Sequence, residues 1–262
     1  MIKLYITRVF ALWGVVMITI GCASITHHEQ NPIGNDKNIE ITIAANTDLS
    51  NVLKRLSKEY EAENKKVKVH LVFAASGDLR NRAKSDAPFD ALIVASPEYL
   101  RDLKIVGKPV ALAYGRLAIY GDNPPASLDE LEDFRGTLLI ANPETSPYGE
   151  LAEKLLKAKL WYEKIKKRII LANNVRDAKL EVDQGKASLG LISLTQALEG
   201  QKNYSLIETP LRITITGVAL KTGEGEAFLK WLTQPKQQGV FTQYGLSPAH
   251  IAEVHRPKGI VK

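Results

Sequence analysis

The sequence predicts an α/β fold, and three observations support this prediction. Runs that alternate apolar and polar residues, as half-buried strands do, are followed by runs with helical spacing of apolar residues, in both halves of the chain. Two of these strand-to-helix turns carry a short polar side chain directly after a pair of alanines. The chain of 262 residues, 45% hydrophobic and 24% charged, has the length and composition of a globular protein with one large domain or two modest ones.

The first turn is the stretch from Ala44 to Leu49. It follows the alternating run 39–43, which predicts a strand, and it opens a helix with apolar residues at helical spacing over residues 49–60. Such a turn leaves free backbone N–H groups and the positive end of the helix dipole at the sheet edge, where an anion binds readily. The alternative is that Asn46 or Thr47 only caps the helix, a role that both residue types favour.

The second turn repeats this pattern. The run 67–73 alternates as a strand, and Ala74-Ala75-Ser76-Gly77 then leads into a helix. Residues 88–96 form a third, nearly all apolar run, as expected of a strand that is buried on both faces. In open α/β sheets, ligands bind beyond the carboxyl ends of the strands, so Asn46 and Ser76 are expected to face one crevice.

The second half repeats the alternation of strands and helices without a detectable sequence repeat. Residues 110–120 form a run long enough to pass from one lobe to another, and residues 121–136 have the composition of a surface loop. Helices are expected after Tyr148 and from about Asn173, and again near residues 228–231 and 240–244. The further strands are predicted at residues 138–142, 169–172, 188–193 and 213–220.

Residues 1–22 read as a signal peptide, with Lys3 and Arg8 ahead of an apolar stretch at residues 9–20. The stretch ends at Thr19-Ile20-Gly21-Cys22, which resembles the lipobox of bacterial lipoproteins, although the usual leucine is Thr19 here. Cys22, the only cysteine, is therefore predicted to be the lipidation site, and an internal disulfide is excluded. Residues 23–37 are polar, with Pro32 and Gly34, and are predicted to form a tether.

The charge pattern and the absence of catalytic motifs argue against two other classes of protein. The net charge of +6 is moderate, and the densest basic cluster, residues 164–168, has no interleaved aromatic residues to stack on bases, so no nucleic-acid partner is expected. The sequence contains no Gly-x-Ser-x-Gly, no P-loop and no His-Glu-x-x-His. The five histidines are dispersed. We therefore expect a binding protein, not an enzyme.

Five short motifs follow one another along the chain: Ala44-Ala45-Asn46, Phe73-Ala74-Ala75-Ser76-Gly77, Ala87-Pro88-Phe89-Asp90-Ala91, Asn142-Pro143 with Pro147-Tyr148-Gly149, and Asn174-Val175-Arg176. In this order and spacing they resemble the motifs of the periplasmic molybdate-binding proteins, the substrate-binding components of ABC-type oxyanion importers. The resemblance covers essentially all of residues 38–248, including the tail from Gly225 onward.

This resemblance implies a two-lobed periplasmic-binding-protein fold, each lobe a mixed, mostly parallel sheet flanked by helices, joined by a hinge of two crossing strands. Lobe I would comprise residues 38–112 and 216–262, and lobe II residues 113–215. The implied ligand is molybdate or tungstate, held without a cofactor and without any protein group bound to the metal. The implied partner is an ABC permease, and the protein would be an extracytoplasmic monomer held at the membrane by its lipid.

The resemblance also implies the binding residues. Asn46 and Ser76 would bind the oxyanion from lobe I, with the Ala45 backbone N–H, and Tyr148 and the Val175 backbone N–H from lobe II. Thr47 and Ser193 are weaker candidates. The chemistry is consistent, because a fully ionised dianion offers only acceptors and so needs hydroxyl, amide and N–H donors.

Two carboxylates leave the identity of the oxyanion open. Asp48 and Asp78 each lie two residues beyond a proposed contact. We expect both to complement a helix dipole while pointing to solvent. A side chain that pointed inward would instead repel molybdate, and would accept the proton of hydrogenphosphate or arsenate. Phosphate or arsenate is therefore one alternative. Sulfate, which cavity size would have to exclude, and a small organic ligand are the others.

Overall fold

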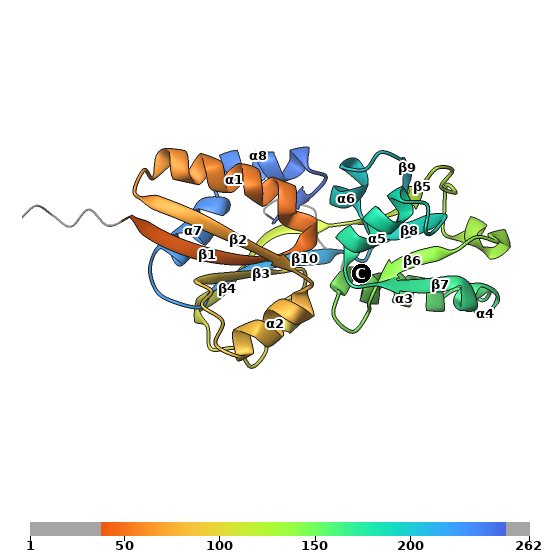
Figure 1. The fold of residues 1–262 in the computed structure, drawn as a ribbon, viewed down its shortest axis with the longest axis horizontal. Helices are drawn as coiled ribbons and strands as arrows, with labels where there is room; N and C mark the ends of the chain where they lie inside the picture. The colour runs from red at the N-terminus through yellow and green to blue at the C-terminus, as the bar shows by residue number, and fades with distance from the viewer. Residues whose placement is uncertain (1–37, 250–262) are drawn as a thin grey trace, which may run out of the picture. The chain divides into compact units, whose positions relative to one another are not determined.

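The computed structural model describes residues 38–249, which form two mixed β-sheets flanked by helices, and this confirms the α/β class and the two-lobed arrangement (Figure 1). The signal peptide, Cys22 and the tether lie outside the described residues. Among residues 38–249, no helix is both long and apolar enough to span a membrane.

The first lobe is built on a six-stranded sheet with the strand order β11-β4-β10-β3-β1-β2. The strands are β1 (Ile39–Asn46), β2 (Val67–Ala74), β3 (Ala91–Val94), β4 (Val106–Gly115), β10 (Ile213–Ala219) and β11 (Ser247–Pro248). The helices of this lobe are η1 (Thr47–Leu49), α1 (Ser50–Glu63), α2 (Ser76–Lys84), η2 (Pro97–Leu100), α7 (Glu224–Leu232) and α8 (Pro235–Gln243), where η marks a 3₁₀ helix.

The second lobe is built on a five-stranded sheet with the strand order β7-β6-β8-β5-β9. The strands are β5 (Leu117–Gly121), β6 (Leu138–Ala141), β7 (Ile169–Ala172), β8 (Leu189–Ser193) and β9 (Asn203–Leu206). The helices are η3 (Asp129–Asp133), α3 (Pro147–Lys157), α4 (Tyr162–Ile165), η4 (Lys166–Arg168), α5 (Val175–Asp183) and α6 (Leu194–Leu198).

Both sheets are mixed, as predicted. The prediction that they would be mostly parallel is wrong. In the first sheet β1 pairs in parallel with β2 and β3, while the β10–β3, β10–β4 and β11–β4 pairs are antiparallel. In the second sheet β6 pairs in parallel with β7 and β8, and β5 is antiparallel to both of its neighbours. The difference arises where the chain changes sheets, because the crossing strands run against the strands of the βα units.

The apolar run 110–120 does pass from one sheet to the other. It breaks at Arg116, so that β4 ends in the first sheet at Gly115 and β5 begins in the second at Leu117. The return runs through residues 207–212, between β9 and β10. The first sheet therefore extends slightly past residues 112 and 216, while the limits of the lobes and the hinge remain predictions.

The alternation in β1 places its side chains on two different hydrophobic layers. Ile41, Ile43 and Ala45 are buried in the cluster that contains the apolar side of α1. Ala44 faces the opposite cluster, which contains Leu79 of α2. Both faces of β1 are therefore covered by helices, as Figure 1 shows for α1 and α2, and only its carboxyl end is free to present a ligand site.

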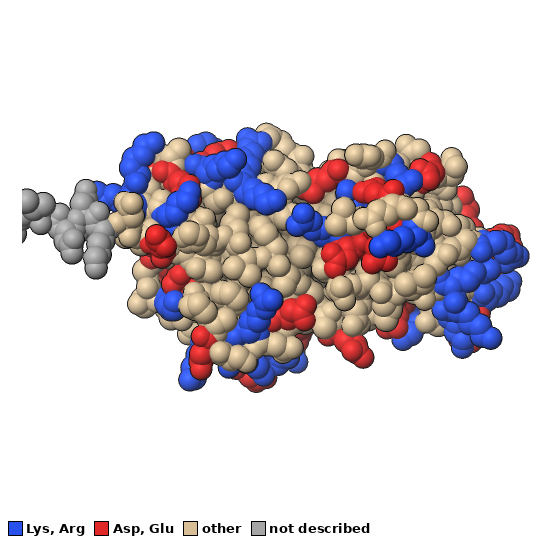
Figure 2. Space-filling view, in the orientation of Figure 1, with Lys and Arg blue, Asp and Glu red and all other residues tan. Residues whose placement is uncertain are grey.

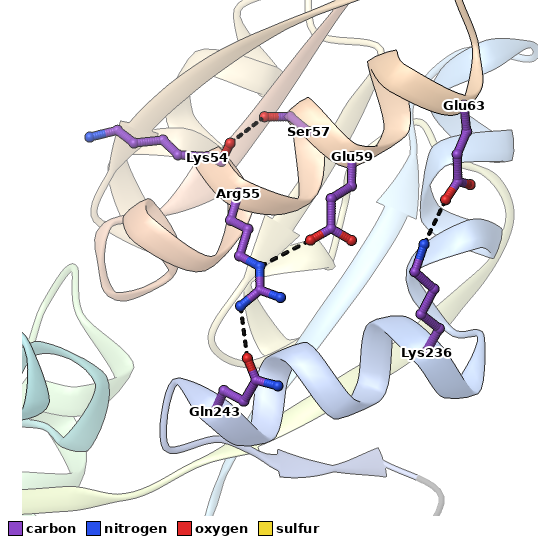
Figure 3. Close-up of polar contacts among 7 residues, drawn as sticks. All are labelled: Lys54, Arg55, Ser57, Glu59, Glu63, Lys236 and Gln243. Carbon is purple, nitrogen blue, oxygen red and sulfur yellow. Dashed lines mark hydrogen bonds and ion pairs between the residues drawn. The ribbon is translucent and has the colours of Figure 1, made fainter.

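The last two long helices pack onto α1. Arg55 donates to Gln243 over 2.7 Å, and Lys236 pairs with Glu63 over 2.8 Å (Figure 3). Beneath these contacts the Tyr60 ring meets the Phe228 ring edge-on, with centroids 5.0 Å apart. Helices α7 and α8 thus pack with α1, and the short strand β11 pairs with β4 of the first sheet.

The basic cluster at residues 164–168 lies in α4 and η4. In Figure 2 these elements lie at the right-hand end of the molecule, where lysines and arginines gather. Lys164 pairs with Glu132, and Lys166 pairs with Glu163. Nearby acidic side chains therefore offset part of this charge, as expected for a solvated helix end.

Candidate functional site

The two predicted turns lie side by side at the carboxyl ends of β1 and β2. In the parallel register of these strands Asn46 is opposite Ala74, so the chain leaves both strands at the same level. It then enters η1 and α1 after Asn46, and α2 at Ser76. The βα units of the first lobe thus direct two helix starts toward one point.

Asn46 and Thr47 do not act as side-chain caps, which excludes the capping alternative. Neither η1 nor α1 receives a side-chain cap hydrogen bond from the residue before it. Both residues are buried, at 1% and 4% exposure, and the Asn46 Nδ2 and Thr47 Oγ1 atoms have no hydrogen-bond partner. Because burying an unpaired polar group is unfavourable, this pair of side chains has the character of a site prepared for a ligand.

Asp48 points inward, so the expectation that it faces solvent is wrong. Its exposure is 1%, and its Oδ2 accepts a 2.6 Å hydrogen bond from the Tyr148 hydroxyl of the second lobe, while its Oδ1 has no partner. The physical reason lies in η1, where a tight 3₁₀ turn buries Thr47, Asp48 and Leu49 together. Asp78 is exposed at the start of α2, as expected.

The environment of Asp48 favours its neutral form. Burial raises the pKa of this carboxyl from 3.8 to about 7, against the Tyr148 hydrogen bond and the Asn46 amide, which lower it. Burial likewise raises the pKa of the Tyr148 hydroxyl well above its usual value, and the charge of Asp48 adds to this. Tyr148 is therefore a donor, and Asp48 changes its charge near neutral pH.

Ser76 is held so that its hydroxyl hydrogen is available. The side chain is fully buried, and its Oγ accepts a 3.1 Å hydrogen bond from the Ala95 N–H. Because a serine hydroxyl accepts and donates at once, this contact leaves the O–H free to donate elsewhere. The neighbouring Gly77 N–H donates to the Thr145 carbonyl over 2.8 Å, a main-chain link between the lobes.

In the second lobe, helices α3 and α5 begin with side-chain caps, which η1, α1 and α2 of the first lobe lack. Ser146 Oγ accepts from the Gly149 N–H, and Asn174 Oδ1 accepts from the N–H groups of Arg176 and Asp177. Asn174 does not accept from the N–H of Val175, the first residue of α5. Residue Val175 is 1% exposed. Figure 1 shows α5 beside the start of α1, and α5 indeed contacts η1.

Ser193 has a structural role that the sequence reasoning did not assign. It caps α6 by accepting from the Gln196 N–H, and its hydroxyl lies 2.8 Å from the Thr195 hydroxyl. Its hydrogen-bonding capacity is thus used within its own lobe. The reasoning also missed Thr145 and the inward carboxyl of Asp48, and for neither does the sequence carry a pattern beyond its place near a helix start.

No metal centre accompanies these groups. Within residues 38–249, no cluster of three or more histidine, cysteine, aspartate or glutamate side chains is placed to hold a metal ion. Asp48 is in contact with the Tyr148 phenol and is influenced by the Asn46 amide and the Glu199 carboxyl. The phenol and the amide suit hydrogen bonding to an oxygen-rich ligand.

Replacing Tyr148 with phenylalanine is expected to lower the free energy of unfolding by about 1.5–3 kcal/mol at pH 8, where it removes a hydrogen bond to a largely ionised Asp48. At pH 5 Asp48 is neutral and the loss is expected to be about 0.5–1.5 kcal/mol. Urea unfolding at the two pH values measures both. Tyr204→Phe, on a ring that is 43% exposed, is the control, and an equal loss at both pH values would contradict the prediction.

Comparison with known proteins identifies the kind of molecule. Residues 41–247 match the profile of the bacterial extracellular solute-binding proteins. A Bacillus subtilis protein, YvgL, provisionally named an ABC transporter substrate-binding lipoprotein, is 24% identical, with 94% of this chain and 99% of YvgL covered. The molybdate-binding protein ModA of Haemophilus influenzae is also 24% identical, over 79% of this chain and 90% of ModA.

Solved structures share the fold. The periplasmic molybdate-binding protein of Azotobacter vinelandii superposes with a TM-score of 0.70 at 21% identity, covering 79% of this chain and 98% of that one. PEB3 of Campylobacter jejuni, solved with bound L-phospholactate, superposes with a TM-score of 0.65 at 16% identity, covering 79% of this chain and 99% of PEB3. At these identities the likeness concerns the fold.

Proposed function

Because the chain belongs to the bacterial extracellular solute-binding protein family, a transport family and not a class of enzymes, we propose that it captures molybdate or tungstate between its lobes and delivers it to an ABC importer. The names of the molybdate-binding relatives support this choice of oxyanion. The site chemistry supports an oxyanion more generally, because it offers buried neutral donors, among them the Asn46 amide and the Tyr148 hydroxyl.

One observation carries the proposal: buried donors without partners stand where the two lobes meet. Asn46 Nδ2 and Thr47 Oγ1 are unpartnered in the first lobe. The Tyr148 hydroxyl reaches the same turn from the second lobe, through Asp48. We assign the oxyanion contacts to Asn46, Ser76, Tyr148 and the backbone N–H groups of Ala45 and Val175, with Thr47 as a further donor and Ser193 as the weakest candidate.

The lobes would open and close about the two chain crossings at Arg116 and residues 207–212. An anion that bridges donors of both lobes favours the closed form, because it makes contacts there that the open form lacks. The importer would then recognise the closed form. We place lobe I at residues 38–112 and 216–262 and lobe II at residues 113–215.

The proposed location is the outer side of the cytoplasmic membrane. A lipid on Cys22 and a flexible tether over residues 23–37 would keep the protein within reach of its permease, as a monomer. The lipoprotein name of YvgL is in line with this. A Cys22→Ala variant that still appears in the membrane fraction would argue against the anchor.

Binding is tested by titration calorimetry of the protein with molybdate, tungstate, sulfate, phosphate and arsenate, supported by thermal shift, since a ligand of the native state raises its stability. We expect molybdate or tungstate to bind most tightly at pH 7. Tighter binding of phosphate or arsenate would reassign the oxyanion, and a response only to an amino acid, sugar or phosphorylated organic acid would reject the proposal.

Replacing Asn46 with alanine is expected to weaken molybdate binding by about 1.5–3 kcal/mol, roughly 10- to 150-fold, because one hydrogen bond to a charged group is lost. Since Asn46 Nδ2 has no partner in the protein, the fold should lose little. Asn123→Ala, at an exposed loop position of the second lobe, is the matched control. Unchanged affinity in Asn46→Ala, measured by calorimetry, would place the site elsewhere.

A further inference from the structure

Asp48 is an acid in the centre of a site proposed for a dianion. Its side chain is buried at the junction of the lobes, with Oδ2 hydrogen-bonded to the Tyr148 hydroxyl. Its Oδ1 is unpartnered, as are Asn46 Nδ2 and Thr47 Oγ1 of the two preceding residues. Building on the proposed function, we propose that the loaded site holds one proton between Asp48 and the bound oxyanion, so that Asp48 determines which anions bind and at what pH.

The hydrogen bond to Tyr148 gives the first argument. A tyrosine hydroxyl has one hydrogen to donate, and in the structure it is donated to Asp48. An ionised Asp48 therefore takes the place of the ligand at this donor, and it repels a dianion as well. A protonated Asp48 needs no donor, so Tyr148 can turn to the oxyanion, and the acid itself becomes a further O–H donor. Protonation of Asp48 thus ends its competition with the ligand for Tyr148, and it leaves both the Tyr148 and the Asp48 hydroxyl free to donate to the oxyanion.

The unpartnered Oδ1 gives the second argument. The Asn46 amide acts on the Asp48 carboxyl, so a ligand held by that amide approaches Asp48 too. A hydrogen placed between Oδ1 and a ligand oxygen satisfies both atoms, whereas two bare acceptors face each other without it.

The charges around Asp48 do not remove this requirement. The hydrogen bond from Tyr148 of α3 favours the ionised form of Asp48. The charge of Glu199, at the end of α6, disfavours it. Arg176 and Lys179 of α5 line a cavity of about 190 Å³ next to Glu199, and Lys179 and Lys54 of α1 act on that glutamate. Asp177 of α5 is bonded to Asn174, and Asp183 to Lys179. The pKa of Asp48, about 7, reflects burial as the largest cause, with Glu199 raising it further and the hydrogen bonds of Tyr148 and Asn46 lowering it.

The source of the proton depends on the anion. Molybdate carries none at neutral pH, so above pH 7 its binding must take one proton from solvent. Hydrogenphosphate brings its own, so it binds to an ionised Asp48 without uptake. Selection among oxyanions at this site thus varies with pH, in a way that cavity size alone does not produce.

The test is calorimetric titration of the full chain with sodium molybdate from pH 6 to 9, in two buffers with different ionisation enthalpies. Above pH 7 we expect uptake of nearly one proton per molybdate and an affinity that falls about tenfold per pH unit; below pH 7 uptake vanishes and affinity is constant. Sodium phosphate, where it binds, should show no uptake above pH 8.

Two variants locate the effect. Asp48→Asn keeps a donor in place of the acid and should bind molybdate with no uptake and less than about a twofold change in affinity over this pH range. Asp78→Asn, the exposed acid at the corresponding point of α2, should behave as the wild-type protein. If Asp48→Asn does not fold, the wild-type proton count decides the question alone.

Failure of this inference is distinct from failure of the proposed function. Tight molybdate binding with no proton uptake and no pH dependence would overturn the role of Asp48 and leave the function standing. A pH dependence that persists unchanged in Asp48→Asn would also overturn it. No response to any oxyanion, at any pH, would reject the function and the inference together.

Discussion

Replacing Asp48 with asparagine is expected to raise the free energy of unfolding of the ligand-free protein at pH 8 by up to about 4 kcal/mol. Burial holds the pKa of Asp48 at about 7 in the folded state, against 3.8 for an unperturbed carboxyl. Between these values the folded protein keeps a proton that the unfolded chain has released, so stability falls as pH rises from about 4 to 7. At about 1.4 kcal/mol per pKa unit, the loss is complete above pH 7. Asparagine does not ionise, so the substitution removes this loss of stability.

Urea unfolding at pH 5 and pH 8 measures this effect. The advantage of Asp48→Asn should be small at pH 5 and largest at pH 8, and it should be absent in Asp78→Asn, because Asp78 is exposed. Destabilisation of Asp48→Asn at pH 8 would mean that the bond from Tyr148 to the carboxylate outweighs the burial of its charge.

Replacing Gly149 with alanine is expected to lower the free energy of unfolding by about 3 kcal/mol or more and to weaken oxyanion binding with it. A Cβ at this position would lie 2.1 Å from the carbonyl oxygen of Ala141. That atom belongs to β6, so the start of α3 must move away from the sheet. Because Tyr148 is the preceding residue, its hydroxyl would move with it.

The control for this substitution is Gly239→Ala in α8, where an added Cβ meets nothing within 4 Å. That change should stabilise the protein by up to about 1 kcal/mol through helix propensity. Thermal unfolding and molybdate calorimetry of the two variants give the comparison. A Gly149→Ala protein with wild-type stability and affinity would show that the close approach of α3 to β6 is dispensable.

The sequence predicted the elements that have strong periodicity. Strands β1 and β2 alternate clearly, and β3 is short and fully apolar, so their type followed from pattern alone. It missed β9, whose residues Asn203–Leu206 form a polar, half-exposed edge strand, and α6, which has only five residues. The long run 110–120 was correctly seen to cross between lobes, although its break at Arg116 was not.

The candidate site was predictable in its backbone and not in its side-chain directions. Asn46 and Ser76 follow strands and precede helices, so their place at one sheet edge follows from topology. The direction of Asp48 depends on the 3₁₀ turn at Thr47–Leu49 and on Tyr148, about a hundred residues away in sequence, whose hydroxyl donates to Oδ2. Local spacing contains neither fact.

The link between the Gly77 N–H and the Thr145 carbonyl involves only main-chain atoms. Exchanging other side chains leaves both atoms in place as long as Gly77 is kept, because a Cβ at position 77 would lie 2.9 Å from the Thr145 Cα. Redesign of the surrounding side chains to accept a different anion would therefore leave this main-chain hydrogen bond intact. The anion preference can thus diverge among descendants of this chain while the hydrogen bond between the lobes is inherited unchanged.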